Sequence, residues 1–423
     1  MSQKKHVIIG TGTAALSAVC MIKRIKPDDT IVMVTKEGHL PYSPTSLPYL
    51  LSGKLDLANL WIKDDEYFRR LGVQVRKNQE AIEVAPEERC VTFADGGRES
   101  YDRLLIATGS TPIRPQIDGL KASDFLGFGN IEDFKKLHGL LKRDSKVAVL
   151  GGGLVGVELA IALFERGHHV TIIEKESTLL PAYFDEEGEP FIRNIFLEQG
   201  IGLLTGAEVV RMKRTNGKIQ IDFSNGQAMD SDLLVSCVGV RPAIDFLMDS
   251  HIIIGRGILV DRSMKTNIDD IYAAGDVAEA PGFFGGKPGI NATLFTAARQ
   301  GEVAGASMCG QDAEYGGWIA ANRLTFFGNV AESVGAATPD EERFFSVKEV
   351  DREKKQFKKL VFDGNTLRLA TFINHKVNLG LFYQIIERQL DVSEYKKLLF
   401  DKPFETSLWC IRNDENRKTR LKV

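Results

Sequence analysis

The amino-acid sequence predicts an α/β protein with two Rossmann-like dinucleotide-binding domains followed by a small α+β domain. The first observation is length, because 423 residues at about 150 residues per domain correspond to two or three domains. The second is a pair of glycine-rich turns near residues 10 and 151, each between an apolar strand and a helix. The third is a change after residue 310, where short strand-like runs alternate with mixed charge.

The first glycine-rich turn follows the apolar strand Val7–Ile9 and precedes a helix. Gly10 permits the tight turn, Gly12 lets the backbone approach a pyrophosphate, and the small Ala15 allows the helix to pack closely on the strand. The helix N-terminus offers free N–H groups and a positive dipole end to a phosphate. Such a motif is weak by itself, so an ordinary glycine turn stays open as the alternative.

The second glycine-rich turn has a stronger signature. It follows the apolar strand Lys146–Leu150 and contains Gly151, Gly153 and Gly156. The strand after the next helix ends in Glu174, where a carboxylate accepts hydrogen bonds from an adenosine ribose and repels a 2′-phosphate. Because no arginine directly follows Glu174, the pattern favours NAD over NADP. A Rossmann-like turn without a nucleotide is the alternative.

Composition and charge exclude several other classes of protein. The net charge of −3 and the isoelectric point near 6.2 argue against nucleic acid as a partner. The five cysteines are isolated, so we expect no disulfide framework, no metal site and no iron–sulfur cluster held by this chain alone. No apolar run reaches ~18 residues, which predicts no membrane span. Lys4 and Lys5 before an apolar stretch imitate a signal peptide, but its cleavage would remove the first motif, so we expect a cytoplasmic protein.

Four further segments carry a family resemblance. They are YDRLLIATGS at 101–110, LLVSCVGVRP at 233–242, DIYAAGD at 270–276 and NATLFTAARQGEVAGASMCG at 291–310. Together with the two turns, this set resembles the flavoproteins with two dinucleotide-binding domains: NADH oxidases, coenzyme A disulfide reductases, and rubredoxin and ferredoxin reductases. The resemblance covers residues 5–310 and implies dinucleotide domains of the three-layer ββα type.

The resemblance implies FAD on the first turn and NAD on the second. Asp276, next to Gly275, would hydrogen-bond the ribityl chain of FAD, with a plain turn aspartate as the alternative. Thr108 and Gly109 complete the expected FAD-binding set. The helix expected to begin near Ala292 would point its N-terminus at the flavin ring, where its dipole favours negative charge.

The resemblance also implies an NAD domain inserted into the FAD domain. We expect FAD-binding segments at 1–115 and 244–313, the NAD domain at 116–243, and an α+β interface domain at 314–423. The basic run at 352–359 is expected to be a solvated hairpin. The basic residues of the C-terminal end are either a frayed end or a docking surface for an acidic iron–sulfur partner; they are Arg412, Arg417, Lys418, Arg420 and Lys422.

The sequence departs from the family pattern at three positions. The carboxylate expected to bind the adenosine ribose of FAD is replaced by Lys36, and we predict Glu37 as its substitute, with a solvated surface glutamate as the alternative. In the oxidases and coenzyme A disulfide reductases of the family, a segment that reads like S-P-C-G-L-P-Y carries a single redox cysteine. Here that position is Thr45, whose hydroxyl cannot form a thiolate, a sulfenic acid or a mixed disulfide. Tyr49 stands where the reductase branch has a lysine or arginine, whose usual partner is retained as Glu158. Glu158 is predicted to position the nicotinamide; an ordinary helix-face carboxylate is an equal alternative.

The remaining cysteines are not expected to replace the missing thiol. Cys20, in the first helix, and Cys237, in an apolar strand, are expected to be buried core thiols. Without a thiol relay, electrons that enter from NADH must leave to an external carrier, for which an iron–sulfur protein or rubredoxin is suited. The reverse direction of electron flow is equally compatible with these residues.

The overall sequence resembles the NADH-binding flavoprotein subunit of acylating 2-oxo acid dehydrogenases of the phenylglyoxylate type. This resemblance predicts an FAD-dependent NAD(H) oxidoreductase subunit that works with an iron–sulfur partner and other subunits of a complex forming acyl-CoA and NADH. One alternative is a stand-alone NADH-dependent ferredoxin or rubredoxin reductase. A third hypothesis, from another class, is an FAD- and NAD-binding redox sensor whose output is an interaction.

Overall fold

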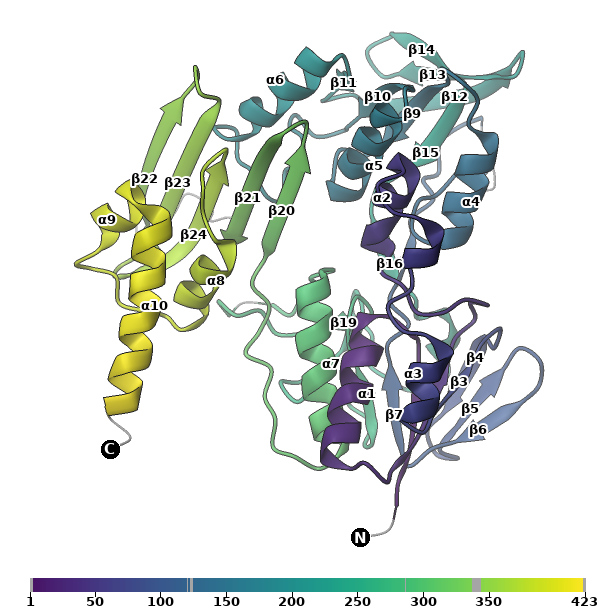
Figure 1. Cartoon of the computed structure of the whole chain (residues 1–423). Coiled ribbons are helices and arrows are strands. Elements are labelled where there is room, and N and C mark those ends of the chain that lie inside the picture. The colour runs from purple at the N-terminus through teal and green to yellow at the C-terminus, as the bar shows by residue number, and fades with distance from the viewer. Residues whose placement is uncertain (1–2, 120, 122–124, 286, 337–343, 421–423) are drawn as a thin grey trace. The chain divides into compact units, whose positions relative to one another are not determined.

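The computed structural model describes residues 3–119, 121, 125–285, 287–336 and 344–420, and the chain divides into two compact units (Figure 1). The first unit contains residues 1–113, 129–131 and 240–318, and the second contains residues 114–128, 132–239 and 319–423. The first unit therefore joins the two segments expected to bind FAD. The second joins the segment expected to bind NAD to the C-terminal domain. The predicted borders at residues 115, 243 and 313 stay a prediction.

The centre of the first unit is a five-stranded parallel sheet. Its strand order is β18 (Ile271–Ala273), β7 (Arg103–Ile106), β1 (Lys5–Ile9), β2 (Thr30–Val34) and β3 (Val73–Arg76). Strands β1, β2 and β7 are mostly buried on both faces, so they appear in the sequence as nearly continuous apolar runs. The first glycine turn follows β1 and residues 274–276 follow β18, so both lie at the carboxyl edge of the sheet, where nucleotides bind in this class of fold.

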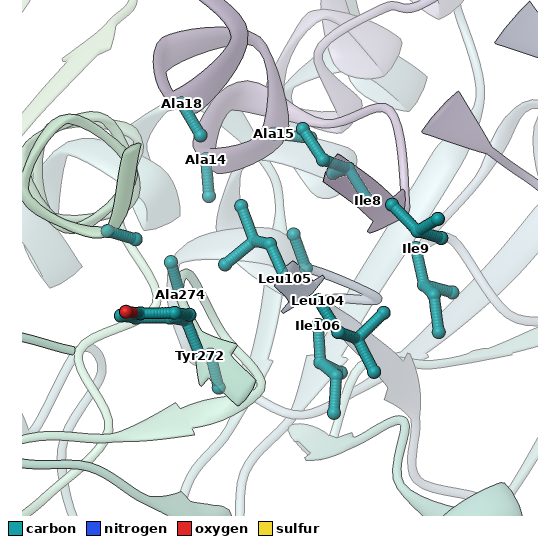
Figure 2. Packing of buried hydrophobic residues seen from close by; sticks show 14 of the residues in the cluster. Ile8, Ile9, Ala14, Ala15, Ala18, Leu104, Leu105, Ile106, Tyr272 and Ala274 are labelled. Atoms are coloured by element: carbon teal, nitrogen blue, oxygen red, sulfur yellow. The ribbon is translucent and has the colours of Figure 1, made fainter. Parts of the chain in front are cut away.

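Helices α1 (Thr13–Ile25) and α7 (Leu294–Met308) lie side by side in close contact (Figure 1). A Cβ atom on Gly301 would lie 2.1 Å from the backbone oxygen of Ala14, and one on Gly305 would lie 2.7 Å from that of Ala18. Figure 2 shows the alanines of α1 beside strand side chains such as Leu105 in the same buried core. Small residues on both helices therefore allow the two backbones to approach each other.

A three-stranded antiparallel sheet adds a further layer to the first unit. Its strands are β4 (Ala81–Ala85), β5 (Cys90–Phe93) and β6 (Arg98–Ser100). Val84 and Phe93 belong to the same hydrophobic core as the parallel sheet, so the unit has the expected three-layer ββα form. The remaining elements are α2 (Leu47–Ser52), α3 (Asp65–Arg70), β8 (Ser110–Pro112), β16 (Val240–Pro242), β17 (Ile258–Leu259) and β19 (Ala278–Glu279).

The second unit contains a second parallel sheet of the same type. Its order is β11 (Gly202–Leu204), β10 (His169–Ile173), β9 (Lys146–Leu150) and β15 (Leu233–Ser236). The helices of this region are α4 (Ile131–Leu140), α5 (Leu154–Glu165) and α6 (Glu189–Gln199). The antiparallel strands β12 (Val209–Thr215), β13 (Lys218–Phe223) and β14 (Ala228–Ser231) pack on the parallel sheet. Met212 and Ile221 from this layer share a core with Ala148 and Leu234.

The C-terminal part of the second unit is an antiparallel sheet with three helices, as expected for an α+β domain. The strand order is β20 (Ala321–Phe326), β21 (Asn329–Gly335), β24 (Thr366–Ile373), β23 (Gln356–Asp363) and β22 (Phe344–Asp351). One face packs on α6, where the rings of Phe326 and Phe196 lie 5.6 Å apart. On the other face, Phe372 contacts Phe382 of α8 (Leu379–Glu387) at 4.9 Å. The helices α9 (Lys396–Asp401) and α10 (Pro403–Arg420) follow.

One expectation for the C-terminal domain is wrong in part. The basic run does form a hairpin between β22 and β23, but two of its lysines are not solvated. Lys358 is only 6% exposed, and Lys359 pairs with Asp185 at 2.6 Å, because alternate residues of β23 point to opposite faces that are both covered. At the C-terminal end, the basic residues up to Arg420 belong to α10, whereas Lys422 lies outside the described residues. Docking of a partner on this basic end stays a prediction.

The close contact of α1 and α7 predicts that Gly301→Ala lowers the free energy of unfolding by about 1–3 kcal/mol, since the added methyl group overpacks the helix interface. Gly139→Ala in α4 is the matched control, because a Cβ atom there has nothing within 4 Å. Helix propensity predicts that this control gains ~0.5–1 kcal/mol. Chemical denaturation of both variants measures the difference, and equal changes would contradict the packing argument.

Candidate functional site

The first glycine turn brings the backbone of the chain against a neighbouring strand. Gly10 has φ +118°, and a Cβ atom on it would lie 2.1 Å from the carbonyl oxygen of Ala107, so no other residue fits. Gly12 is the N-cap residue of α1 and provides no side chain to cap the helix. A Cβ atom on Gly12 would have no atom within 4 Å. The helix thus begins without a side-chain cap and with open space beside Gly12, an arrangement that suits a phosphate.

Gly275 and Asp276 lie at the same edge of the first sheet. Gly275 has φ +84°, and its N–H donates to Oε1 of Gln300 at 2.8 Å. Gln300 is buried in α7 and was missed by sequence reasoning, since nothing in the sequence links it to residue 275. Oδ2 of Asp276 accepts a hydrogen bond from the Ser110 hydroxyl at 3.1 Å. Burial raises the pKa of the Asp276 carboxyl, although this hydrogen bond opposes the shift.

Thr108 and Gly109 join the end of β7 to the chain after β16. The Thr108 hydroxyl donates to the carbonyl oxygen of Ala243 at 2.9 Å, and the N–H of Ala243 donates to the carbonyl oxygen of Gly109 at 3.0 Å. Gly109 has φ +68°, which glycine adopts without strain. The structure thus places both residues in a crossing of two chain segments, where the Thr108 hydroxyl already has a partner within the protein.

Glu37 and Lys36 follow β2. Lys36 is exposed, whereas Glu37 is half-buried and its Oε1 accepts a hydrogen bond from the Tyr42 hydroxyl at 3.3 Å. The same hydroxyl accepts a hydrogen bond from the N–H of Ile131 at 2.9 Å. Glu37 is thus held at the edge that follows β2, the position from which an adenosine ribose is recognised. Its role in FAD binding stays a prediction.

The segment that carries the redox cysteine in related flavoproteins forms a short 3-10 helix, Pro44–Ser46, before α2. Thr45 is exposed, and its hydroxyl lies 2.8 Å from that of Ser43. Tyr49, in α2, is 49% exposed. The position of the redox cysteine is therefore occupied by a hydroxyl group that hydrogen-bonds the hydroxyl of Ser43.

The expectation that Cys20 is a buried core thiol is wrong. Cys20 is exposed, because the buried face of α1 is formed by positions 14, 15, 18, 19 and 22, and its Sγ lies 3.4 Å from the Tyr67 hydroxyl. Cys237 follows β15, and burial raises the pKa of its thiol to about 12. Burial also raises the pKa of Cys309, to about 11, and that of Cys410. These three thiols are neutral near pH 7, the form that does not act as a nucleophile.

The second glycine turn repeats the geometry of the first. Gly151 has φ +110°, and a Cβ atom on it would lie 2.4 Å from the carbonyl oxygen of Cys237. Gly153 is the N-cap residue of α5, and a Cβ atom on it would have nothing within 4 Å. A Cβ atom on Gly156 would lie 2.0 Å from the carbonyl oxygen of Gly151, so helix and turn touch through backbone atoms. This turn also leaves the start of a helix open for a phosphate.

Glu174 lies directly beside the second turn. Its Oε2 accepts a hydrogen bond from the N–H of Gly152 at 2.5 Å, and its Oε1 accepts one from the N–H of Glu176 at 2.8 Å. The carboxylate is therefore fixed by two backbone donors next to the turn. Each oxygen of a carboxylate can accept more than one hydrogen bond, so both remain able to accept from ribose hydroxyls.

Glu158 lies in the second turn of α5, close in sequence to the glycines. Burial raises the pKa of its carboxyl to about 7, so near neutral pH the group is divided between its protonated and ionised forms. A carboxyl group with such a pKa can hold or release a proton under working conditions. Its contact with a nicotinamide stays a prediction.

Both turns fit a dinucleotide. Each combines a glycine that no larger residue can replace, a helix start without a side-chain cap, and open space in front of it. Among the described residues there is no group of three or more His, Cys, Asp or Glu side chains that could hold a metal ion. Within the same part of the chain, no helix is both long and apolar enough to cross a membrane.

The fold and these two turns define a protein of the class that binds two dinucleotides. The chain belongs to the pyridine nucleotide-disulphide oxidoreductase family, whose model matches residues 4–310. The members of this family are NAD(P)H-dependent FAD oxidoreductases, so the chain is an enzyme of this type. Some of its homologues pass electrons to rubredoxin or putidaredoxin, and one is a subunit of a complex.

Individual relatives support this assignment. The chain is 34% identical over 402 residues to the epsilon subunit of NADH-dependent phenylglyoxylate dehydrogenase of Aromatoleum evansii. The aligned region covers 94% of this chain and 95% of that subunit. It is 31% identical over 315 residues to NADH-rubredoxin oxidoreductase of Clostridium acetobutylicum, which covers 74% of this chain and 77% of that protein. The covalent putidaredoxin reductase–putidaredoxin complex matches with a TM-score of 0.84 at 20% identity, over 92% of this chain and 94% of that chain, which shows the fold alone.

The raised pKa of Glu158 predicts a pH-dependent stability. Between its ordinary value of 4.5 and about 7, the unfolded chain releases the proton before the folded chain does, so the free energy of unfolding falls as pH rises. Glu158→Gln has no carboxyl group there to titrate. The difference in the free energy of unfolding between this variant and the wild type should therefore shift in favour of the variant by about 1–3 kcal/mol as the pH rises from 5 to 8. Urea denaturation across this range measures the gain. Glu165→Gln, at the exposed end of the same helix, should follow the wild-type profile; the same gain in both variants would contradict the assignment.

Proposed function

We propose that this chain is an FAD-dependent NAD(H) oxidoreductase subunit that passes electrons between NAD(H), FAD and an iron–sulfur partner. We further propose that it works within a 2-oxo acid dehydrogenase complex of the phenylglyoxylate type, which forms an acyl-CoA and NADH. The observation that carries this proposal is the 34% identity to the epsilon subunit over nearly the whole length of both chains. The thiamine and iron–sulfur chemistry of such a complex would belong to other subunits.

The first unit would hold FAD. The open N-terminus of α1 behind Gly10 and Gly12 would bind the pyrophosphate, with Ala15 allowing the helix to lie close to β1. Asp276 and Glu37 would hydrogen-bond the ribityl chain and the adenosine ribose of FAD. When bound, FAD supplies hydride uptake in pairs of electrons and their release one at a time. The chain itself supplies binding, orientation and electrostatics.

The start of α7 supports the same arrangement. The helix expected to begin near Ala292 begins at Leu294, and the Thr293 hydroxyl caps it by accepting from the N–H of Thr296 at 3.3 Å. A helix N-terminus carries a partial positive charge that stabilises nearby negative charge. We infer that this dipole end favours the reduced form of the cofactor.

The second unit would hold NAD on the turn formed by Gly151, Gly153 and Gly156. Glu174, fixed by two backbone N–H groups, would accept hydrogen bonds from the adenosine ribose. Its negative charge would repel the 2′-phosphate of NADP, which supports NAD as the substrate. Glu158, whose pKa is close to 7, would orient the nicotinamide through its carboxyl group.

Thr45 supports an external electron acceptor. A hydroxyl group cannot take over the electron-pair chemistry of a thiol, and the thiols of Cys237, Cys309 and Cys410 are kept neutral by burial. Thr45 and these three thiols therefore offer no disulfide that electrons from NADH could reduce. This favours release to a separate iron–sulfur protein.

A second candidate function is a stand-alone NADH-dependent ferredoxin or rubredoxin reductase. The observation in its favour is the 31% identity to NADH-rubredoxin oxidoreductase over three quarters of both chains. The two candidates share the same cofactor chemistry and differ in partners. A complex subunit is found bound to its partner subunits, whereas a stand-alone reductase is active alone with an added carrier protein.

Affinity purification of the chain from its native host tests this distinction. The proposed function predicts stoichiometric co-purification with iron–sulfur and thiamine-dependent subunits, and 2-oxo acid-dependent formation of NADH by the purified assembly. In the same assembly, Thr45→Ala should leave NADH-to-dye turnover within about threefold, since no thiol-like step passes through this side chain. Purification of the chain alone with full activity toward ferredoxin or rubredoxin would favour the second candidate, and a collapse of turnover in Thr45→Ala would show a chemical role for Thr45.

A further inference from the structure

A loop at residues 175–188 forms a wall against the second glycine turn. The N–H of Leu180 donates to the carbonyl oxygen of Gly152 at 2.9 Å, and a Cβ atom on Gly152 would lie 2.8 Å from a methyl carbon of Leu179. Both leucines are fully buried. Leu180 has φ +53°, a conformation that a leucine keeps only when its surroundings hold it in place. The first half of the loop is therefore fixed directly beside Glu174 and the turn.

The second half of the same loop is held by lysines of the C-terminal sheet. Lys359 of β23 donates to Oδ2 of Asp185 at 2.6 Å and to Oε2 of Glu187 at 3.0 Å. Lys348 of β22 also pairs with Glu187. The Lys359 side chain is only 18% exposed, so these contacts are better shielded from water and salt than an open surface pair. Burial alone would raise the pKa of Asp185, but the hydrogen bond from Lys359 and one from the N–H of Gly188 hold it below its ordinary value.

Buried polar contacts connect the two halves of the loop. Glu189 is 1% exposed, and its Oε1 accepts hydrogen bonds from the N–H of Leu179 at 2.9 Å and from Nε of Arg193 at 3.0 Å. The N–H of Glu189 in turn donates to the carbonyl oxygen of Asp185 at 2.9 Å. Two hydrogen bonds thus lead from the residue that Lys359 contacts to the leucine that touches the turn. Displacing Asp185 would therefore disturb the wall of the nucleotide site.

We propose that Lys359 is a positioning residue for NAD, which fixes the loop 175–188 so that the adenosine side of the nucleotide site is formed before the nucleotide arrives. This inference rests on the proposed function in one respect, the binding of NAD at the second turn. A site that is formed in advance binds more tightly, because binding does not have to order the loop. The C-terminal domain then contributes to cofactor affinity, in addition to any interface it forms.

A second ion pair separates this role from simple attachment of the C-terminal domain. Lys355, at the tip of the hairpin between β22 and β23, pairs with Glu198 near the end of α6. Like Lys359, it joins the C-terminal domain to the rest of the second unit. It does not contact the loop 175–188 through this pair. Lys355→Met is therefore the matched control for Lys359→Met. Both substitutions keep an aliphatic side chain and remove the charge.

The experiment uses the full-length, FAD-loaded protein with two readouts. Hydrogen–deuterium exchange of peptides covering 177–189 is measured without nucleotide. The Kd for NAD⁺, which does not reduce the oxidised flavin, is measured by calorimetric titration, with the KM for NADH in dye turnover as a companion. In Lys359→Met we expect faster exchange of these peptides and a Kd raised about fivefold or more, with kcat at saturating NADH within about twofold. Lys359→Arg should restore both readouts, and Lys355→Met should match the wild type.

Three results would overturn the role proposed for Lys359. Unchanged exchange and Kd in Lys359→Met would overturn the inference while leaving the proposed function intact. An equal effect in Lys355→Met would also overturn it, because the effect would then come from attachment of the domain. A wild-type protein that binds no NADH would overturn both this inference and the proposed function.

Discussion

Both nucleotide sites are shaped by the close approach of backbone to backbone at a few glycines. At Gly10 and Gly151 a single methyl group would lie 2.1 Å and 2.4 Å from the carbonyl oxygen of a neighbouring strand end. Each turn can therefore pass close to its sheet only as glycine, and each following helix begins at the sheet edge with its N–H groups exposed. Gly301 extends the same principle to α7, which contacts α1 through backbone atoms. Without these contacts neither glycine turn could lie close to its sheet with the following helix starting at the sheet edge.

Electrostatics adds what the glycines cannot supply. Glu174 is tied to two backbone N–H groups, which fixes a negative charge beside the second turn. Asp276 and Glu158 are instead carboxyl groups whose pKa is raised by burial, so a proton is more easily held at these two positions. Thr45 adds an exposed hydroxyl at the position where the resemblance to NADH oxidases and coenzyme A disulfide reductases would place a redox cysteine. Together these groups suit hydride exchange with a nucleotide and release of electrons to a separate protein.

Much of this arrangement could be predicted from the sequence, because the two glycine turns and the apolar strands beside them are local signals. Gln300 could not, since its hydrogen bond to Gly275 joins distant parts of the chain and has no periodicity to reveal it. Cys20 was misplaced because a helix has two faces, and an apolar residue type alone does not tell which face it occupies. The burial of Lys359 could not be predicted either, because its partner Asp185 lies in a packed loop more than a hundred residues earlier in the chain. Long-range pairing of polar groups is what the sequence leaves open.

The most direct test of the central claim, electron transfer through FAD without a thiol relay, is an anaerobic titration of the purified flavoprotein with NADH. The visible absorbance of the flavin and the NADH consumed are followed together until reduction is complete. We predict full bleaching with about one NADH per flavin, and much weaker bleaching with NADPH, because in the proposed function the flavin alone takes up the electrons of NADH. Consumption of about two NADH per flavin, or a long-wavelength thiolate–flavin absorbance band, would show a redox-active sulfur and contradict the account.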